Sequence, residues 1–267
     1  MTGPGRAWLA QSLSKGAAGI ALPHIERALA GEGDWRRAHA WITAATSGEV
    51  SASGTAGLYQ GLPAVAFMLD AAAAGTGRYR AGLADLDGHL ACLASARAEA
   101  GLARMRAGRL PGFHEYDVFF GLAGLGALLL RRDPGSDALE RVLRYLVALT
   151  RPLHVDGAEL PGWWAWHDPH RRSSSEFPGG HCNFGAAHGV SGILALLGHA
   201  ARRGLVVDGQ REAIARVLSW LDRWRQDSDA GPWWPEWITA AEFRAGRPRQ
   251  AVPNRPGWCY GTPGIVH

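Results

Sequence analysis

Residues that exchange protons or bind metals occur in three short segments of the sequence, each of which ends in a glycine. The first segment reads HEYDVFFG at residues 114–121, the second HCNFGAAHG at 181–189, and the third NRPGWCYG at 254–261. They supply an acid, a histidine and a cysteine in turn. Carboxylates and imidazoles act as general acids and bases, and a thiolate is both a nucleophile and a metal ligand. We therefore expect catalysis or metal binding where these segments meet.

A short unit of the form G-x-x-[GA]-[ILV] follows these residues and recurs five times. Its spacings are 45, 60, 68 and 72 residues, and it begins at Gly16, Gly61, Gly121, Gly189 and Gly261. The first four occurrences open apolar stretches that reach about residues 30, 73, 130 and 200. A recurring unit with growing insertions indicates an internal repeat.

Amphipathic stretches alternate with these apolar ones, at residues 34–46, 81–105, 136–149 and 210–224. Apolar residues at helical spacing predict helices, and Ser136 is placed to cap the third stretch. An apolar helix must be buried, and a helix with one apolar stripe can cover it. The alternation therefore predicts an inner ring of helices wrapped by an outer ring, with few strands. Glycines at the inner-helix starts would let backbones approach closely.

The composition is that of a globular protein and excludes several classes of function. The chain has 267 residues, of which 47% are hydrophobic and 19% are charged, and its net charge is +4. The arginines are scattered rather than clustered, which argues against nucleic acid as a partner. No run of about 18 residues is apolar and uncharged, so we expect no transmembrane segment. The odd count of three cysteines favours a reducing, cytoplasmic location.

Three strings carry a resemblance to a known family: YDVFFGLAGLG, NFGAAHGVSGIL and RPGWCYGTPGI. They resemble the LanC family of lanthipeptide cyclases, the lanthionine synthetase C-like proteins, over about residues 12–267. The resemblance implies an all-α fold, an α/α toroid with inner and outer rings of helices, in agreement with the alternation above. We expect residues 1–267 to form a single domain of this kind. The family has seven inner helices, so the five repeat starts predict that the C-terminal repeats are lacking.

The resemblance also implies a reaction, the zinc-dependent formation of a carbon–sulfur bond. The substrate is a precursor peptide whose dehydroalanine or dehydrobutyrine residues are made by a separate dehydratase. A cysteine thiol of the same peptide adds to the alkene and closes a thioether ring. One zinc ion would deprotonate that thiol, because metal coordination strongly lowers the pKa of a bound thiol. The resulting enolate must then be protonated, which requires a positioned acid.

Five residues match the functional positions of the family. Cys259 resembles the first zinc ligand, and His188 resembles the histidine that acts as acid and base beside the metal. Asp117 matches an aspartate that orients substrate or assists proton transfer. Arg255 and Tyr260 match residues that flank the zinc cysteine, where they would stabilise the charge of the enolate.

The sequence departs from the family at the remaining metal ligands. These come from a Cys-His-Gly motif after the W-C-Y-G motif, and no such motif occurs before the sequence ends at His267. We therefore interpret the chain as about the first two thirds of a stand-alone lanthionine cyclase from a bacterium with a GC-rich genome, with an incomplete zinc site.

Two other functions remain open at this point. The chain is alternatively an inactive peptide-binding scaffold, or a fragment without function, because it lacks the Cys-His-Gly ligands. A glycoside hydrolase on the same architecture would need two carboxylates across a cleft, for which Asp117 and Glu115 are the candidates.

Structural roles compete with the functional ones at several residues. Asp117 is also placed to cap the helix near Gly121. Cys92 and Cys182 are interpreted as packing residues. The remaining charged and ring-bearing residues are interpreted as solvated loop residues, namely His114, Glu115 and His181. Most of the tryptophans in the two long loops are expected to pack those loops down, namely Trp163, Trp164, Trp166, Trp233, Trp234 and Trp237.

Overall fold

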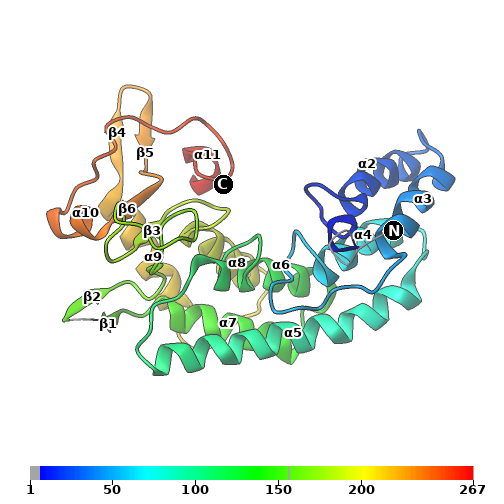
Figure 1. Ribbon diagram of the computed structural model, residues 1–267, viewed down its shortest axis with the longest axis horizontal. Helices are drawn as coiled ribbons and strands as arrows, with labels where there is room; N and C mark the ends of the chain where they lie inside the picture. Colours follow the sequence, from blue (N-terminus) through cyan, green and yellow to red (C-terminus); the bar gives the residue numbers. More distant parts are fainter. Residues whose placement is uncertain (1–6, 156, 267) are drawn as a thin grey trace. The chain divides into compact units, whose positions relative to one another are not determined.

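The computed structural model describes residues 7–155 and 157–266, so His267 lies outside the described residues (Figure 1). The contacts group into two compact units. The first comprises the residues up to Ala96 together with Ala127–Leu139, and the second comprises Arg97–Gly126 and the residues from Glu140 onward. The expectation of a single domain over residues 1–267 stays a prediction.

The described chain is mainly helical, and the predicted helix positions are confirmed to within about two residues. The helices opened by the glycine unit are α2 (Ala17–Leu29), α4 (Leu62–Ala73), α6 (Leu122–Arg132), α8 (Val190–Arg202) and α11 (Thr262–Val266). The amphipathic helices between them are α3 (Trp35–Thr46), α5 (Arg80–Arg106), α7 (Asp137–Leu149) and α9 (Gln210–Trp224). Three further short helical segments are α1 (Ala7–Ala10), α10 (Ala240–Ala245) and the 3-10 turn Phe113–Glu115. The all-α class is therefore confirmed.

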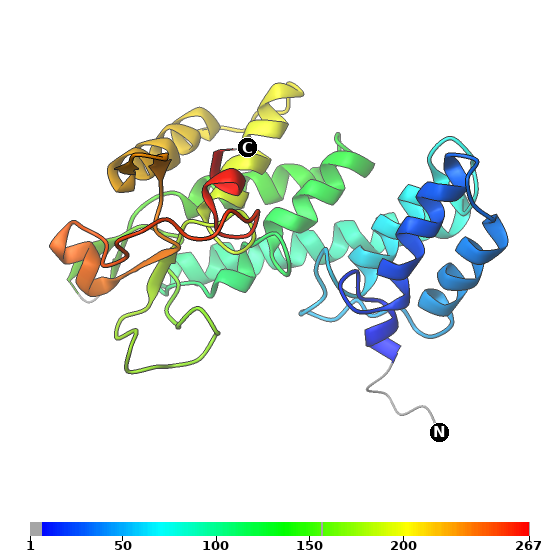
Figure 2. The ribbon, with the colours of Figure 1, turned by 90° about the horizontal axis from the view of Figure 1, so that it is seen from above.

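The first unit is built around α2, which packs against both α3 and α4 (Figures 1 and 2). α4 is buried on nearly every side, as an inner helix should be. α2 buries only one face, because Glu26 and Arg27 interrupt its apolar surface. At the end of α6, Arg132 pairs with Asp70 of α4 at 2.8 Å and with Asp87 of α5 at 2.6 Å. These partly buried ion pairs join three helices of the unit.

Helix starts and faces follow from local sequence, with one exception. Ser136 caps α7 as expected, since its Oγ accepts a hydrogen bond from Leu139 N at 3.3 Å. The interpretation of Cys92 as a packing residue is wrong, because its side chain is exposed. The buried face of α5 carries Leu90 and Ala94, four residues apart. Cys92 lies midway between them in sequence and therefore projects from the opposite face.

The second unit combines α8, packed on α9, with three small antiparallel sheets. All six strands in the described chain are three residues long, in agreement with the expectation of few strands: β1 (Leu153–Val155) with β2 (Ala158–Leu160), β3 (His181–Asn183) with β6 (Trp237–Thr239), and β4 (Gln226–Ser228) with β5 (Gly231–Trp233) (Figure 1). In the β3–β6 pair, Cys182 lies opposite Ile238. This pairing joins the two long loops that precede α8 and α11.

An aromatic cluster lies beneath β3 and supports it. Phe184 stacks on Trp220 of α9 with 6.2 Å between the ring centroids, and Trp163 packs edge-on against Trp220 with 5.7 Å between the centroids. Such pairs add about 0.5–1.5 kcal/mol each beyond the burial of their area. The packing interpretation, made for most of these tryptophans, is confirmed by four that are buried, whereas Trp166 is 52% exposed: the buried ones are Trp163, Trp164, Trp233 and Trp234.

Among the described residues, no helix combines the length and the apolar character needed to cross a lipid bilayer.

Candidate functional site

Asp117 is fixed at the start of α6 by the backbone that follows it. Its Oδ1 accepts hydrogen bonds from the backbone N–H groups of Phe120 and Gly121, each at 2.7 Å. The side chain is fully buried. The capping role that the sequence offered for Asp117 is therefore present, because these helix-start donors have no partner within the helix. One carboxylate oxygen is used in this way, and Oδ2 remains.

His188 uses that second oxygen. Its Nδ1 lies 2.6 Å from Asp117 Oδ2, although the two residues are 71 positions apart. A carboxylate held among backbone donors accepts, so we assign the proton to Nδ1. Nε2 has no hydrogen-bond partner within residues 7–155 and 157–266. With 18% of its side chain exposed, His188 can offer Nε2 to a ligand.

Aromatic rings surround the imidazole. The ring centroids of Phe113 and Phe119 each lie 4.9 Å from the centroid of the His188 ring. The Phe120 ring is nearly parallel to the His188 ring, with 6.2 Å between their centroids. Tyr260 approaches from the last helix start at 6.1 Å. These rings limit the access of water and hold the imidazole plane, which a group that transfers protons to a defined atom requires. The Phe-Phe pair of the first segment was missed in the sequence, where no spacing rule indicates it.

Backbone hydrogen bonds join the three predicted segments. Val118 N donates to Ala187 O at 3.0 Å, and Ala187 N donates to Cys259 O at 3.3 Å. Gly185 makes this approach possible, because a Cβ there would lie 2.9 Å from the Tyr260 ring and would also overlap Cys259 O. The expectation that the three segments meet is confirmed.

The second glycine of the unit holds each loop against its helix. A Cβ on Gly192 would lie 2.5 Å from Ala186 O, and one on Gly264 would overlap Trp258 O. The glycines therefore admit the carbonyl of the chain's own preceding loop, and at Gly192 the side chain of Val118 also approaches, 2.8 Å from such a Cβ. The loops that precede α8 and α11 carry His188 and Cys259.

Tyr260 is the predicted residue that lies beside the Asp117–His188 pair. Burial raises the pKa of Tyr260 to about 12, and the charge of Glu236 acts in the same direction. The phenol therefore stays protonated at neutral pH and is a hydrogen-bond donor rather than an anion.

Arg255 and Cys259 are exposed, and the structure does not bring their side chains into hydrogen bonds or ion pairs with the other predicted residues in the described chain. Arg255 is held through its backbone, where its N–H donates to Asn254 Oδ1 at 2.8 Å. Asn254 Nδ2 in turn donates to Glu236 Oε2 at 3.0 Å. The turn is thus attached to the segment that leads into β6.

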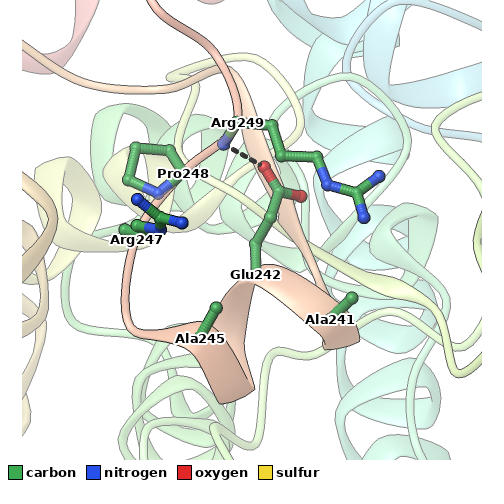
Figure 3. A pocket seen from close by; sticks show the side chains of 6 residues that line it. All are labelled: Ala241, Glu242, Ala245, Arg247, Pro248 and Arg249. Carbon is green, nitrogen blue, oxygen red and sulfur yellow. Dashed lines mark hydrogen bonds between the residues drawn. The ribbon is translucent and has the colours of Figure 1, made fainter.

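Glu242 of α10, which follows β6, holds together the residues on either side of that helix (Figure 3). Its Oε1 accepts from Arg249 N at 2.7 Å, and its Oε2 accepts from the Thr239 N–H and hydroxyl at 2.8 and 2.6 Å. The carboxylate forms one wall of a hollow of about 450 Å³ beside α10, together with Arg247 and Pro248. This hollow shares no lining residue with the Asp117–His188 pair.

The described residues do not by themselves fit the zinc ion that the family resemblance implies. Within residues 7–155 and 157–266, no group of three His, Cys, Asp or Glu side chains is placed to hold a metal ion. A catalytic zinc site takes three protein ligands. Cys259 supplies one predicted thiol ligand, which alone does not complete such a site.

Two of the three residues interpreted as solvated loop positions are instead held by partners inside the unit, His181 fully buried and Glu115 partly buried. His181 is fully buried, with Nδ1 2.6 Å from His167 O and with Nε2 unpaired. Glu115 accepts from Arg104 at 2.9 Å and from the Tyr145 hydroxyl at 2.6 Å. Only His114 is exposed as expected. Pairing of β3 with β6 and an ion pair inside the unit account for the difference.

The packing interpretation of Cys182 is confirmed. The thiol is buried, and Trp163 Nε1 donates to its sulfur at 3.0 Å. Burial raises the pKa of Cys182 far above the range of a free thiol. Such a thiol is neither a nucleophile nor a metal ligand.

Comparison with known proteins agrees with the geometry. The profile of the lanthionine synthetase C-like protein family matches residues 7–267. The nisin biosynthesis protein NisC of Lactococcus lactis subsp. lactis is 28% identical over 155 residues, which are 57% of this chain and 36% of that protein. The solved structure of a nisin cyclase matches with a TM-score of 0.78 at 22% identity, over 97% of this chain and 64% of the other.

The chain thus spans a little over one third of NisC in the aligned region and less than two thirds of the solved cyclase. The structural likeness confirms the α/α-toroid fold class. Because the family profile covers nearly every residue, the chain belongs to the lanthionine synthetase C-like protein family.

Proposed function

We propose that this chain carries the proton-transfer half of a lanthionine cyclase, which adds peptide cysteine thiols to dehydroalanine or dehydrobutyrine. Membership of the family and the likeness to NisC and nisin cyclase support this class of reaction. The observation that carries the proposal is the hydrogen bond of 2.6 Å between His188 and the buried Asp117. The substrate is a dehydrated precursor peptide, and a separate dehydratase supplies it.

The reaction needs two proton movements that balance. The thiol loses its proton as sulfur bonds to the β-carbon of the alkene, and the enolate gains a proton at the α-carbon. His188 Nε2 is the group to accept or deliver these protons, because Nδ1 is engaged by Asp117. Asp117 holds the tautomer and stabilises the imidazolium when it forms. Tyr260 as a phenol, and Arg255 as a cation, would stabilise the enolate oxygen.

The test uses a synthetic peptide with one dehydroalanine and one cysteine, incubated in deuterium oxide. Wild-type protein is expected to yield a thioether with one deuterium at the α-carbon. His188→Ala should lower the rate of ring closure by about 10²–10⁴-fold, as expected for loss of a general acid and base. His154→Ala is the matched control, because that exposed histidine lies on the β1–β2 hairpin and pairs there with Glu159. Equal rates in all three proteins contradict the proposal, and peptide binding without turnover in wild type indicates the scaffold instead.

Zinc dependence belongs to the same proposal, with Cys259 as one ligand. Its exposed thiol is accessible to a metal, and the described residues do not supply a complete set of ligands. Elemental analysis of purified protein should find zinc that Cys259→Ala loses. Cys92→Ala is the control, as the other exposed thiol. Equal zinc content in both variants refutes the ligand assignment. A cytoplasmic location stays a prediction from the odd number of cysteines.

A further inference from the structure

A cation lies beside the candidate site, on the loop that follows β2. The guanidinium of Arg171 lies over the ring of Phe120, 5.1 Å from its centroid. Phe120 is nearly parallel to the His188 imidazole, at 6.2 Å. Two successive ring contacts therefore separate the charge of Arg171 from the group assigned to proton transfer.

The base of this loop is held by hydrogen bonds, and one of them joins it to the site. Asp168 Oδ1 accepts from the N–H groups of His170 and Arg172 at 2.9 and 2.8 Å, and Arg171 N donates to Asp168 O at 2.9 Å. Asp168 and His167 are both buried. His167 Nε2 accepts from Phe113 N at 3.2 Å, and Phe113 is one of the rings against His188. Phe113 therefore contacts both the base of this loop and the imidazole.

The backbone at Arg171 is strained in order to place this side chain. Its φ is 63°, and only one other non-glycine residue of the described chain, Tyr79, has a positive φ. Such a conformation is unfavourable for residues other than glycine and is found disproportionately at binding and catalytic sites.

No carboxylate neutralises Arg171 within the part of the chain that the structure describes. Its side chain is exposed and forms no ion pair there. Three acidic groups of this region are already engaged: Asp117 by two backbone N–H groups and His188, Glu115 by Arg104, and Asp168 by its own loop. The neighbouring His114 carries no negative charge. Its ring is partly shielded from water although the residue is exposed, and this desolvation, followed by the charge of Arg171, lowers its pKa.

We infer that Arg171 is a carboxylate-binding subsite that holds an acidic group of the substrate peptide beside His188. A guanidinium presents two parallel donors to a carboxylate, which a surface of uncharged rings cannot do. At roughly 3.3 Å per residue of extended chain, the acidic group would lie within about four residues of the reacting carbon. The inference rests on the proposed function for the identity of the peptide, but the binding site can be tested without turnover.

The test measures binding of unreactive peptides that contain serine in place of dehydroalanine. One peptide carries glutamate two residues from the serine, and its partner carries glutamine. Each is made with a free and with an amidated C-terminus, which distinguishes a side-chain carboxylate from the terminal one. Affinities are measured by fluorescence anisotropy for wild type, Arg171→Gln, Arg171→Lys and the control Arg172→Gln, an exposed cation of the same loop.

Arg171→Gln is expected to weaken binding of the carboxylate peptide about tenfold, which corresponds to one charge-assisted contact. It should leave the peptide that lacks that carboxylate unchanged, and Arg172→Gln should affect neither. Arg171→Lys should retain part of the affinity, because it keeps the charge without the two parallel donors. Equal losses for both peptides, or equal losses in both glutamine variants, overturn the inference.

The two proposals fail in distinguishable ways. If ring closure is absent in wild type but the carboxylate preference of Arg171 is present, the proposed function fails and the subsite stands. If ring closure depends on His188 while Arg171→Gln binds all peptides normally, the subsite fails alone. In an active protein, Arg171→Gln should raise KM for the carboxylate peptide about tenfold and change kcat by less than about twofold.

Discussion

The starts of α6 and α11 carry the same glycine unit but hold their reactive side chains in opposite ways. At the start of α6, Asp117 is buried and accepts three hydrogen bonds, one of them from His188. At the start of α11, the thiol of Cys259 is exposed. A buried carboxylate is stable only when its oxygens are paired, whereas an exposed thiol is solvated by water. The repeat therefore positions the loops, and burial decides which of their side chains are held by hydrogen bonds before a substrate binds.

The largest expected effect separates the two roles of Asp117. Asp117→Asn keeps an oxygen to accept from Phe120 and Gly121, but its amide N–H₂ would face His188 Nδ1 and favour the wrong tautomer. We expect the rate of ring closure to fall by about 10²–10⁴-fold while the free energy of unfolding changes by only about 1 kcal/mol. Rates and thermal denaturation of the same protein check this.

Asp117→Ala is the comparison variant, because it removes both roles. It should lose activity and in addition lower the free energy of unfolding by about 1–3 kcal/mol, since buried backbone donors lose their acceptor. An asparagine variant that closes rings at the wild-type rate would show that the two helix starts do not differ in the way described.

A second prediction concerns the buried histidine on the strand that leads to His188. Burial lowers the pKa of His181 to about 4, despite the favourable hydrogen bond to His167 O. Below pH 6.5 the unfolded chain therefore binds a proton that the folded chain does not. The free energy of unfolding should fall by about 3 kcal/mol between pH 6.5 and 4.

Urea denaturation over this pH range measures the effect, and His181→Gln should flatten the profile. A profile for wild type that coincides with that of the variant would remove His181 as its cause.

The third prediction compares two glycines of α8. Gly192→Ala should lower the free energy of unfolding by about 1–3 kcal/mol, because its Cβ would press on Ala186 O and on Val118 Cγ2 at 2.8 Å. Gly198→Ala, in the same helix, meets nothing within 4 Å and should raise stability by about 0.5–1 kcal/mol. Thermal denaturation of both variants checks the opposite signs. Two changes of the same sign would contradict the role given to the repeat glycine.

Much of the fold follows from local sequence, and the site only in part. The bounds of α9 agree with the predicted 210–224, because apolar spacing and the preceding glycine are both local signals. β3 and β6 were not predicted, because each is three residues long and their pairing joins segments more than 50 positions apart. Likewise, no spacing indicates that Asp117 and His188 touch. The resemblance places both in one site, whereas the hydrogen bond between them depends on how the two loops fold together.

Cys92 shows the reverse failure. Its alanine- and leucine-rich surroundings suggest burial, yet the helical phase of α5 places it outside. His181 was read as a loop residue, since the strand that buries it has no local signal. Composition predicts only the average burial of a segment. The phase of a helix, or the pairing of a strand with a distant one, decides whether an individual side chain is buried.

The burial of Cys182 has a consequence for a protein that handles dehydroalanine. An alkene that accepts a peptide thiol also accepts a thiol of the protein, so self-alkylation competes with ring closure. Cys182 lies on the strand that leads to the His188 loop, but its sulfur is enclosed, receives a hydrogen bond from Trp163 and is held as the neutral thiol. This buried cysteine is thereby inert toward the alkene, and covalent adducts would form at the two exposed thiols instead.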